Sequence, residues 1–326
     1  MPLVAIASLT LNPVSTLAEK PTPAATASAT PAATATASPV APAAGENKAA
    51  APKAEPKSEQ ATAVNPEVQS EVEKKAAEKR AQLLKDAEAT LDETRKAVEA
   101  LDQGKKDEAL AALERVTGKL DLIVARDPNL ALAPVSVATI VRDIYGRSDT
   151  AADVVKTASD HLDDGRVQEA RALLSGLASE AVLQVTNIPL ATYPAAIKTV
   201  APLIDAGKVD EAKATLRTAL NTLVVESYII PLPKIRAEAM LKEAEKLAQK
   251  SDRNGDENKK LHDLIEGTRN ELKLGETLGY GTKKDYKPLY EQLDDIKEKT
   301  QDGKSGTGFF DKIKDSLRDF KDNIAS

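Results

Sequence analysis

Apolar residues recur at helical spacing over most of the chain that follows residue 65. The clearest series lies between residues 84 and 101, and its members are Leu84, Ala87, Leu91, Thr94, Val98 and Leu101. These intervals of three and four residues predict an amphipathic helix, with Asn65 as its N-cap and Pro66 in its first turn. The series covers about two and a half heptads, fewer than a free-standing coiled coil needs. It favours one side of an intramolecular helical hairpin over an intermolecular coiled coil.

One pattern occurs three times, as ALDQGKKDEALAAL from Ala100, HLDDGRVQEARALL from His161 and LIDAGKVDEAKATL from Leu203. Each copy has a central glycine, a basic residue directly after it and a glutamate four positions on; the glycines are Gly104, Gly165 and Gly207. Glycine accepts the left-handed conformation that ends a helix, and acidic groups suit the first turn of the next helix. The pattern therefore predicts three diverged antiparallel helix-turn-helix hairpins.

The elbows are unevenly spaced. The glycines are separated by 61 and then 42 residues, whereas a strict solenoid keeps a fixed period. The elbow resembles that of tetratricopeptide repeats, but the similarity is limited to a few positions. Diverged copies within one bundle, or a loose array of three repeats, both fit this spacing.

A β-branched segment containing or flanked by proline follows each hairpin. The three segments are LAPVSVATIVRD at 132–143, AVLQVTNIPL at 181–190 and TLVVESYIIPLP at 222–233. Such runs predict short strands or extended connectors, and their prolines disfavour long central strands. The expected fold class is mainly α, with antiparallel helical hairpins and a few short strands or connectors shared by the repeats.

The C-terminal part predicts further helices and a hinge. Glycine-rich residues 300–308 form the expected hinge, and the series after it is Phe310, Ile313, Leu317, Phe320 and Ile324. This helical spacing predicts a C-terminal amphipathic helix that docks on the bundle. A membrane-surface or partner-binding helix is the alternative.

The N-terminal part has a different composition. An apolar run from Leu3 to Leu11, followed by small residues up to Ala18, is typical of a signal peptide, although no basic residue precedes it. Residues 19–64 are mostly Ala, Thr, Pro and Ser, and they predict a disordered linker. We therefore expect a signal peptide at 1–18, this linker at 19–64 and a helical domain at 65–326. A periplasmic or secreted protein is expected, with a cytoplasmic one left open.

Charge and composition exclude several classes of function. The net charge is −6, with 45 basic and 51 acidic residues interspersed, which argues against a nucleic-acid partner. No run after the N-terminus is long enough to cross a membrane. Cysteine is absent and histidine occurs twice, which argues against a transition-metal site. No nucleophile–base pair or cofactor motif is visible, so no catalytic, cofactor or metal residues are assigned.

Three residues are candidates for ligand binding. Tyr193 and Tyr228 lie in the second and third connector segments, and an amphipathic ring can line a pocket there. His161 lies at the second elbow, where it could sense acid because histidine titrates in the physiological range. Ordinary core packing is the alternative for all three.

Two long runs resemble the YfdX family of bacterial proteins. They are TGKLDLIVARDPNLALAPV from Thr117 and ETLGYGTKKDYKPLYEQLDDIKEKTQDGKSGTGFFDKIKDSL from Glu276, and the resemblance covers roughly residues 80–326. It implies a mainly helical, exported or envelope-associated protein linked to stress responses. The family contributes no catalytic residues to carry over.

These observations favour a non-enzymatic envelope protein that binds a small amphipathic ligand or a client protein through its helical repeats. The alternative is an oligomeric structural or adaptor protein of tetratricopeptide-like hairpins, in which the partner is a second copy of the chain. An enzyme is the third and weakest reading.

Overall fold

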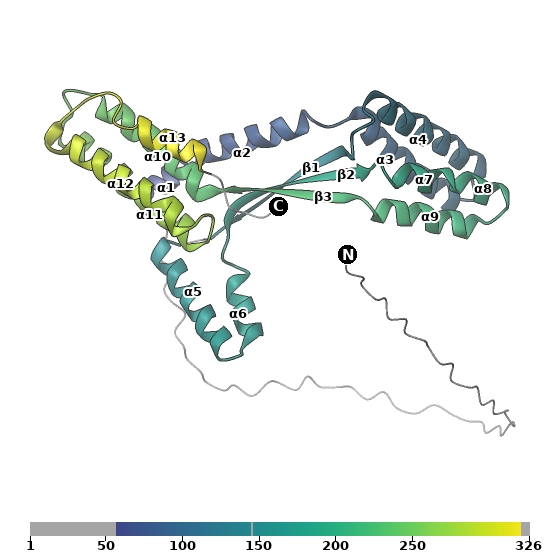
Figure 1. Cartoon of the computed structure of the whole chain (residues 1–326), viewed down its shortest axis with the longest axis horizontal. Coiled ribbons are helices and arrows are strands. Elements are labelled where there is room, and N and C mark those ends of the chain that lie inside the picture. The colour runs from purple at the N-terminus through teal and green to yellow at the C-terminus, as the bar shows by residue number, and fades with distance from the viewer. Residues whose placement is uncertain (1–56, 145, 321–326) are drawn as a thin grey trace, which may run out of the picture. The chain divides into compact units, whose positions relative to one another are not determined.

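The computed structural model describes residues 57–144 and 146–320 (Figure 1). The predicted signal peptide, most of the predicted linker and Ile324 lie outside these residues. The fold is mainly helical with a three-stranded sheet, as the sequence predicts. Within the described part of the chain, no helix is both long and apolar enough to cross a membrane.

The N-terminal half alternates helices with the first two strands. In chain order its elements are α1 (Glu59–Ala63), α2 (Asn65–Arg80), α3 (Lys85–Asp102), α4 (Lys106–Arg126), β1 (Leu132–Asp143), α5 (Ser148–Asp163), α6 (Val167–Leu174) and β2 (Ser179–Pro189). The C-terminal half consists of α7 (Tyr193–Lys198), α8 (Val200–Asp205), α9 (Val209–Asn221), β3 (Val224–Pro231), α10 (Leu232–Ala248), α11 (Gly255–Thr277), α12 (Lys283–Thr300), a 3-10 turn (Gln301–Gly303) and α13 (Asp311–Asp319).

The three predicted elbows join α3 to α4, α5 to α6 and α8 to α9. Their glycines have φ angles of 73°, 74° and 74°. The residue after each glycine donates its backbone N–H to a carbonyl five positions earlier, as in Lys208 to Leu203 at 2.8 Å. This is the C-terminal cap that left-handed glycine permits. One alanine of each second helix, at Ala109, Ala170 or Ala212, is fully buried.

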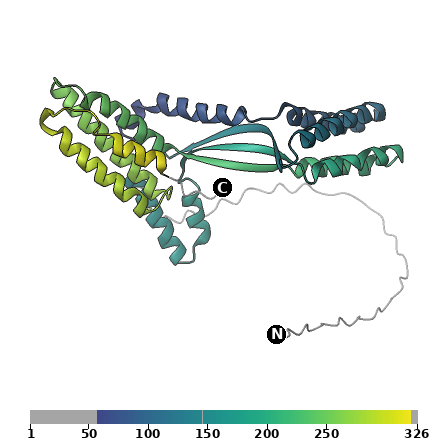
Figure 2. The same ribbon diagram turned by 45° about the horizontal axis from the view of Figure 1, so that its top comes forward.

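Each hairpin leads into one strand of an antiparallel sheet with the order β1-β2-β3. Leu132 pairs with Pro189 at one end of the sheet, and Asp143 pairs with Ser179 at the other. Pro189 and Pro231 occupy the last positions of their strands, where a missing N–H costs little. Helix α2 contacts β1 and β2 and runs alongside the sheet (Figure 2).

Two hydrophobic cores form at opposite ends of the strands. One core joins the first and third hairpins and includes Ala133 and Ile188 at the sheet. The other joins α2 to α10, α11, α12 and α13 and includes Ala181. Phe310, Ile313 and Leu317 are buried in this second core, so the C-terminal helix docks on the bundle rather than presenting its apolar face outward.

Two predicted boundaries were wrong. The single helix expected to run through the series from Leu84 is interrupted, because α2 ends at Arg80 and Leu84 is extended and donates its N–H to the Pro134 carbonyl of β1 at 3.1 Å. The fold also begins before residue 65. Ser58 caps α1 by accepting the Ala61 N–H, and Val64 rather than Asn65 is the N-cap of α2.

Replacing an elbow glycine tests the backbone argument. A Cβ added at Gly207 would meet no heavy atom within 4 Å, so only the left-handed conformation opposes a side chain. We expect Gly207→Ala to lower the free energy of unfolding by about 1–2 kcal/mol. Gly118, within α4, is equally uncrowded but has no positive φ. Gly118→Ala is the matched control and should raise stability by up to about 1 kcal/mol. Chemical denaturation would measure both, and equal signs would contradict the argument.

Candidate functional site

A groove of about 870 Å³ lies where the connection between α2 and α3 passes the sheet. Helix α4 closes one side with Ile123 and Arg126, and strands β1, β2 and β3 contribute to another side. The remaining lining comes from residues 79–86 and from the connection between α4 and β1. The interruption at residues 81–84 brings Leu83 and Leu84 into the lining. The apolar surface of the groove consists of Leu83, Leu84, Ile123, Leu130, Leu132, Pro134 and Val185.

Tyr228 is the predicted site residue that lines this groove. Side chains alternate between the two faces of a strand, so Tyr228 and Glu226 of β3 share the face of Val185 and Asn187 on β2. The Tyr228 side chain is 37% exposed. The Lys79 ammonium of α2 lies 3.5 Å from the centre of its ring, within range of a cation–π interaction.

Charged groups surround the apolar surface. Arg126 and Asp86 form an ion pair at 2.8 Å, and Glu226 accepts a hydrogen bond from Asn187 Nδ2 at 3.1 Å. Lys79 and Lys85 line the groove without an ion pair to any residue the structure describes. An apolar cleft with an aromatic ring and two such ammonium groups suits an amphipathic molecule with an anionic head.

The other two candidate residues lie elsewhere, so the three do not converge on one pocket. Tyr193, in α7, is fully buried in the core shared by the first and third hairpins. Its hydroxyl donates to Thr94 Oγ1 at 3.1 Å, and burial raises its pKa. His161 is mostly buried beside the second elbow, with Nε2 3.9 Å from Glu169 Oε2. Tyr193 therefore packs the core, whereas Tyr228 faces the groove.

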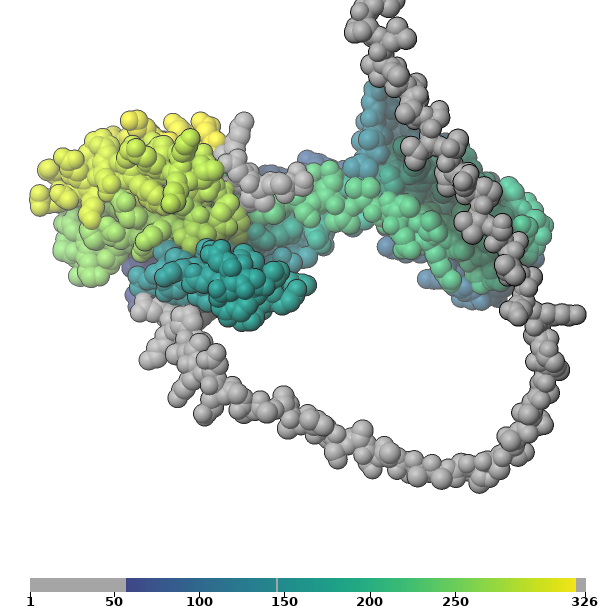
Figure 3. Space-filling view, turned by 60° about the horizontal axis from the view of Figure 1, so that its bottom comes forward, coloured from purple at the N-terminus to yellow at the C-terminus, as the bar shows by residue number. Residues whose placement is uncertain are grey.

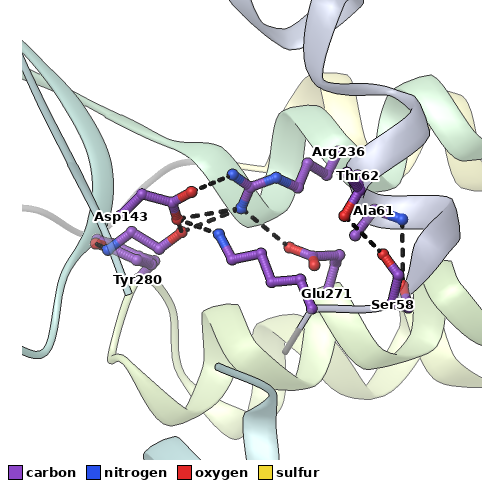
Figure 4. A network of polar contacts seen from close by, with 9 residues as sticks. Ser58, Ala61, Thr62, Asp143, Arg236, Glu271 and Tyr280 are labelled. Atoms are coloured by element: carbon purple, nitrogen blue, oxygen red, sulfur yellow. Dashed lines mark hydrogen bonds and ion pairs between the residues drawn. The ribbon is translucent and has the colours of Figure 1, made fainter. Parts of the chain in front are cut away.

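A buried ionic cluster lies at the opposite end of the sheet (Figure 4). Arg236 of α10 is 2% exposed, and its Nη2 donates to Asp143 Oδ2 at 2.6 Å. Lys57 also donates to Asp143, as does Ser179 Oγ at 2.7 Å. Glu271 of α11 lies 3.6 Å from Arg236 Nη1. The cluster connects the segment before α1 to strands β1 and β2 and to helices α10 and α11.

The two carboxylates of this cluster have opposite pKa shifts. Burial alone would raise the pKa of Asp143, but hydrogen bonds from Arg236 and Lys57 outweigh it and hold the pKa below its usual value. Burial raises the pKa of Glu271, although Arg236 and Lys57 oppose the rise. Burial also lowers the pKa of Lys57. Asp143 is therefore the carboxylate that accepts hydrogen bonds from Arg236. Glu271 is a second acidic group near Arg236, and its buried Oε2 atom has no hydrogen-bond partner among the described residues.

Sequence reasoning missed both this cluster and most of the groove. Arg236, Glu271 and Lys57 come from distant parts of the chain, and no local pattern connects them. The one available signal for the groove was the adjacent pair Leu83–Leu84, which places two large apolar side chains on different sides of a continuous helix. Within residues 57–144 and 146–320, no three His, Asp or Glu side chains are placed to hold a metal ion.

One protein family matches the part of the chain that contains most of the three hairpins and of the sheet. The family model described as YfdX protein matches residues 90–229. Residues 90–229 belong to the YfdX family. The match includes the run from Thr117, whereas the run from Glu276 lies outside it. The groove residues of α4, β1, β2 and β3 fall within the YfdX region, and those of α2 and the α2–α3 connection precede it.

A solved structure of YfdX from Salmonella Typhi also matches. It is 16% identical in sequence with a TM-score of 0.33, and the match covers 46% of this chain and 93% of that chain. No curated protein matches the chain.

The ionic cluster makes a prediction about pH. A depressed folded-state pKa means that the Asp143 carboxylate stabilises the fold above its ordinary pKa, and that this stability is lost as pH falls through the folded value. A raised folded-state pKa has the reverse effect, so ionised Glu271 opposes folding above that value and the opposition is relieved as pH falls through it. We expect Asp143→Asn to cost about 1–3 kcal/mol at neutral pH, a range that allows for the partial exposure of Asp143.

Glu271→Gln is the matched variant, because it also removes one charge from the cluster. It should cost less than Asp143→Asn at neutral pH. Wild type should gain stability relative to Glu271→Gln as pH is lowered toward the ordinary pKa of a glutamate carboxyl. Urea denaturation across this range measures both variants. A Glu271→Gln difference that does not vary with pH would contradict the assignment.

Proposed function

We propose that the protein is a non-enzymatic binding protein that holds a small amphipathic molecule with an anionic head in the groove beside Tyr228. The observation that carries the proposal is the lining itself. Apolar side chains from α4, β1 and the α2–α3 connection line the same groove as the partly exposed Tyr228, and Lys79 and Lys85 lie among them. Clefts of this volume and composition are typical of small-molecule sites.

The charges of the lining favour one polarity of head group. Arg126 is paired with Asp86, and Glu226 accepts a hydrogen bond from Asn187. Asp127 also lines the groove, without an ion pair to a described residue. An anionic head near Lys79 and Lys85 would gain charge-assisted hydrogen bonds, whereas a cationic head would face two ammonium groups. The Lys79 ammonium already lies over the Tyr228 ring, so a head group that binds beside this ring would also contact the ammonium.

The proposal also includes a cellular location, the bacterial envelope, and a physiological role in stress response. The apolar run Leu3–Leu11 and the YfdX resemblance support both. If the protein is exported through this run, its mature form begins shortly after Ala18. Mass spectrometry of the native protein from the envelope fraction would determine the N-terminus, and intact residues 1–18 in that fraction would contradict the cleaved signal peptide.

Ligand binding can be measured with a defined probe. We expect sodium dodecanoate, below its critical micelle concentration, to raise the melting temperature of the full chain and to bind in calorimetry. Dodecyltrimethylammonium has the same chain length and the opposite charge, so it should bind more weakly. Absence of binding by both probes would argue against a lipid-like ligand, and tighter binding of the cation would contradict the role of the lysines.

Variants of the lining locate the probe. Tyr228→Ser should weaken dodecanoate binding about tenfold through loss of the ring face. Val225→Ser is its control, since Val225 is exposed on the other face of the same strand. Lys85→Gln should weaken binding, and Lys105→Gln at the exposed first elbow should leave it unchanged. Equal effects of site and control variants would place the probe elsewhere.

A further inference from the structure

The three hairpins differ in how they bury equivalent apolar positions. Aligned on their glycines, each hairpin has a large apolar residue three positions before the glycine and another nine positions after it. In the first and third hairpins these residues are 0–3% exposed, and they are Leu101, Leu113, Ile204 and Leu216. In the second hairpin the equivalents Leu162 and Leu174 are 48% and 45% exposed.

The cause lies in how the hairpins pair. The first and third hairpins pack on each other, with α3 against α9 and α4 against α7 and α8, and their four apolar residues share one core. The second hairpin contacts α11 through α5. The outer face with Leu162 and Leu174 has no hairpin against it in the described part of the chain. The space-filling view shows this hairpin in teal on the near side (Figure 3).

The pairing of the first and third hairpins is reciprocal. Helix α3, the first of the first hairpin, contacts α9, the second of the third hairpin. In return, α4 of the first hairpin contacts α7 and α8, which precede the elbow of the third. A two-fold symmetric interface requires this arrangement, because each patch must be complementary to itself. Related hairpins of this chain already meet that condition, so two identical copies of the second hairpin can meet it as well.

Charges at equivalent positions fit the same pairing. Asp102, two positions before its glycine, lies 3.5 Å from Lys213, six positions after the glycine of the third hairpin. The equivalents in the second hairpin are Asp163 and Arg171. Neither has an ion-pair partner among the residues the structure describes. Across a two-fold axis, Asp163 of one copy would face Arg171 of the other, twice.

We propose that the α5–α6 hairpin is a self-association surface, on which a second copy of this chain packs its own α5–α6 hairpin with the geometry of the first and third hairpins. The pairing covers Leu162 and Leu174 and forms two symmetric Asp163–Arg171 ion pairs. It is independent of the ligand groove, which lies at the other end of the sheet.

Complementary charge reversal tests this geometry in the full-length chain. Asp163→Arg and Arg171→Asp should each weaken self-association about tenfold or more, since each creates two like-charge contacts. An equimolar mixture of these two variants should regain it, because both contacts between unlike copies are then attractive. Sedimentation velocity from micromolar to submillimolar concentrations measures all three samples, and circular dichroism checks that each variant is folded.

Apolar substitutions provide the second arm. Leu162→Gln and Leu174→Gln should abolish self-association, whereas Leu122→Gln should not, although Leu122 of α4 is similarly exposed at 50%. A wild-type chain that stays monomeric over the whole range overturns the proposal. Self-association that persists in both leucine variants, or that the mixed charge variants do not regain, overturns it too.

Discussion

Antiparallel pairing of β2 with both of its neighbours is the constraint on which the rest of the structure depends. In an antiparallel sheet of sequential strands, successive connections lie at alternate ends. The hairpin before β1 and the hairpin between β2 and β3 therefore meet at the Leu132–Pro189 end, where they share a core. The hairpin between β1 and β2 is placed at the Asp143–Ser179 end, apart from its two relatives.

This separation gives the two ends of the sheet different means of stabilisation. At one end, repeats of similar sequence bury leucine, isoleucine and alanine against each other. At the other end, the chain after β3 supplies α10 to α13, which share a core with α2. The Arg236–Asp143 ion pair joins α10 to the last residue of β1, so it anchors the C-terminal helices to the sheet. Loss of either partner would leave a charge uncompensated at a largely buried position, so the pair opposes other arrangements of α10 against the sheet.

The sequence revealed the features that local interactions determine. An elbow needs a left-handed glycine and a carbonyl five residues before the following N–H, and both lie within one short motif, as at Gly207. Proline and β-branched residues likewise located the strands. Nonlocal contacts determined the rest. The Pro134 carbonyl of β1 binds Leu84 and interrupts a helix whose apolar spacing is continuous, and tertiary packing alone decides that Tyr193 is buried while Tyr228 is exposed.

The same topology keeps the proposed functions of the protein from interfering with each other. The groove uses Pro134 and Asn187 near one end of the sheet, and the α5–α6 hairpin follows Asp143 at the other. The 11 residues of β2 connect these ends, and an extended strand of that length spans roughly 35 Å. A second copy on the α5–α6 hairpin would therefore leave the groove open to solvent. Any energetic coupling between ligand and self-association would have to pass through the hydrogen-bonded sheet or through α2, which lines the groove with Lys79 and packs in the core of α10 to α13.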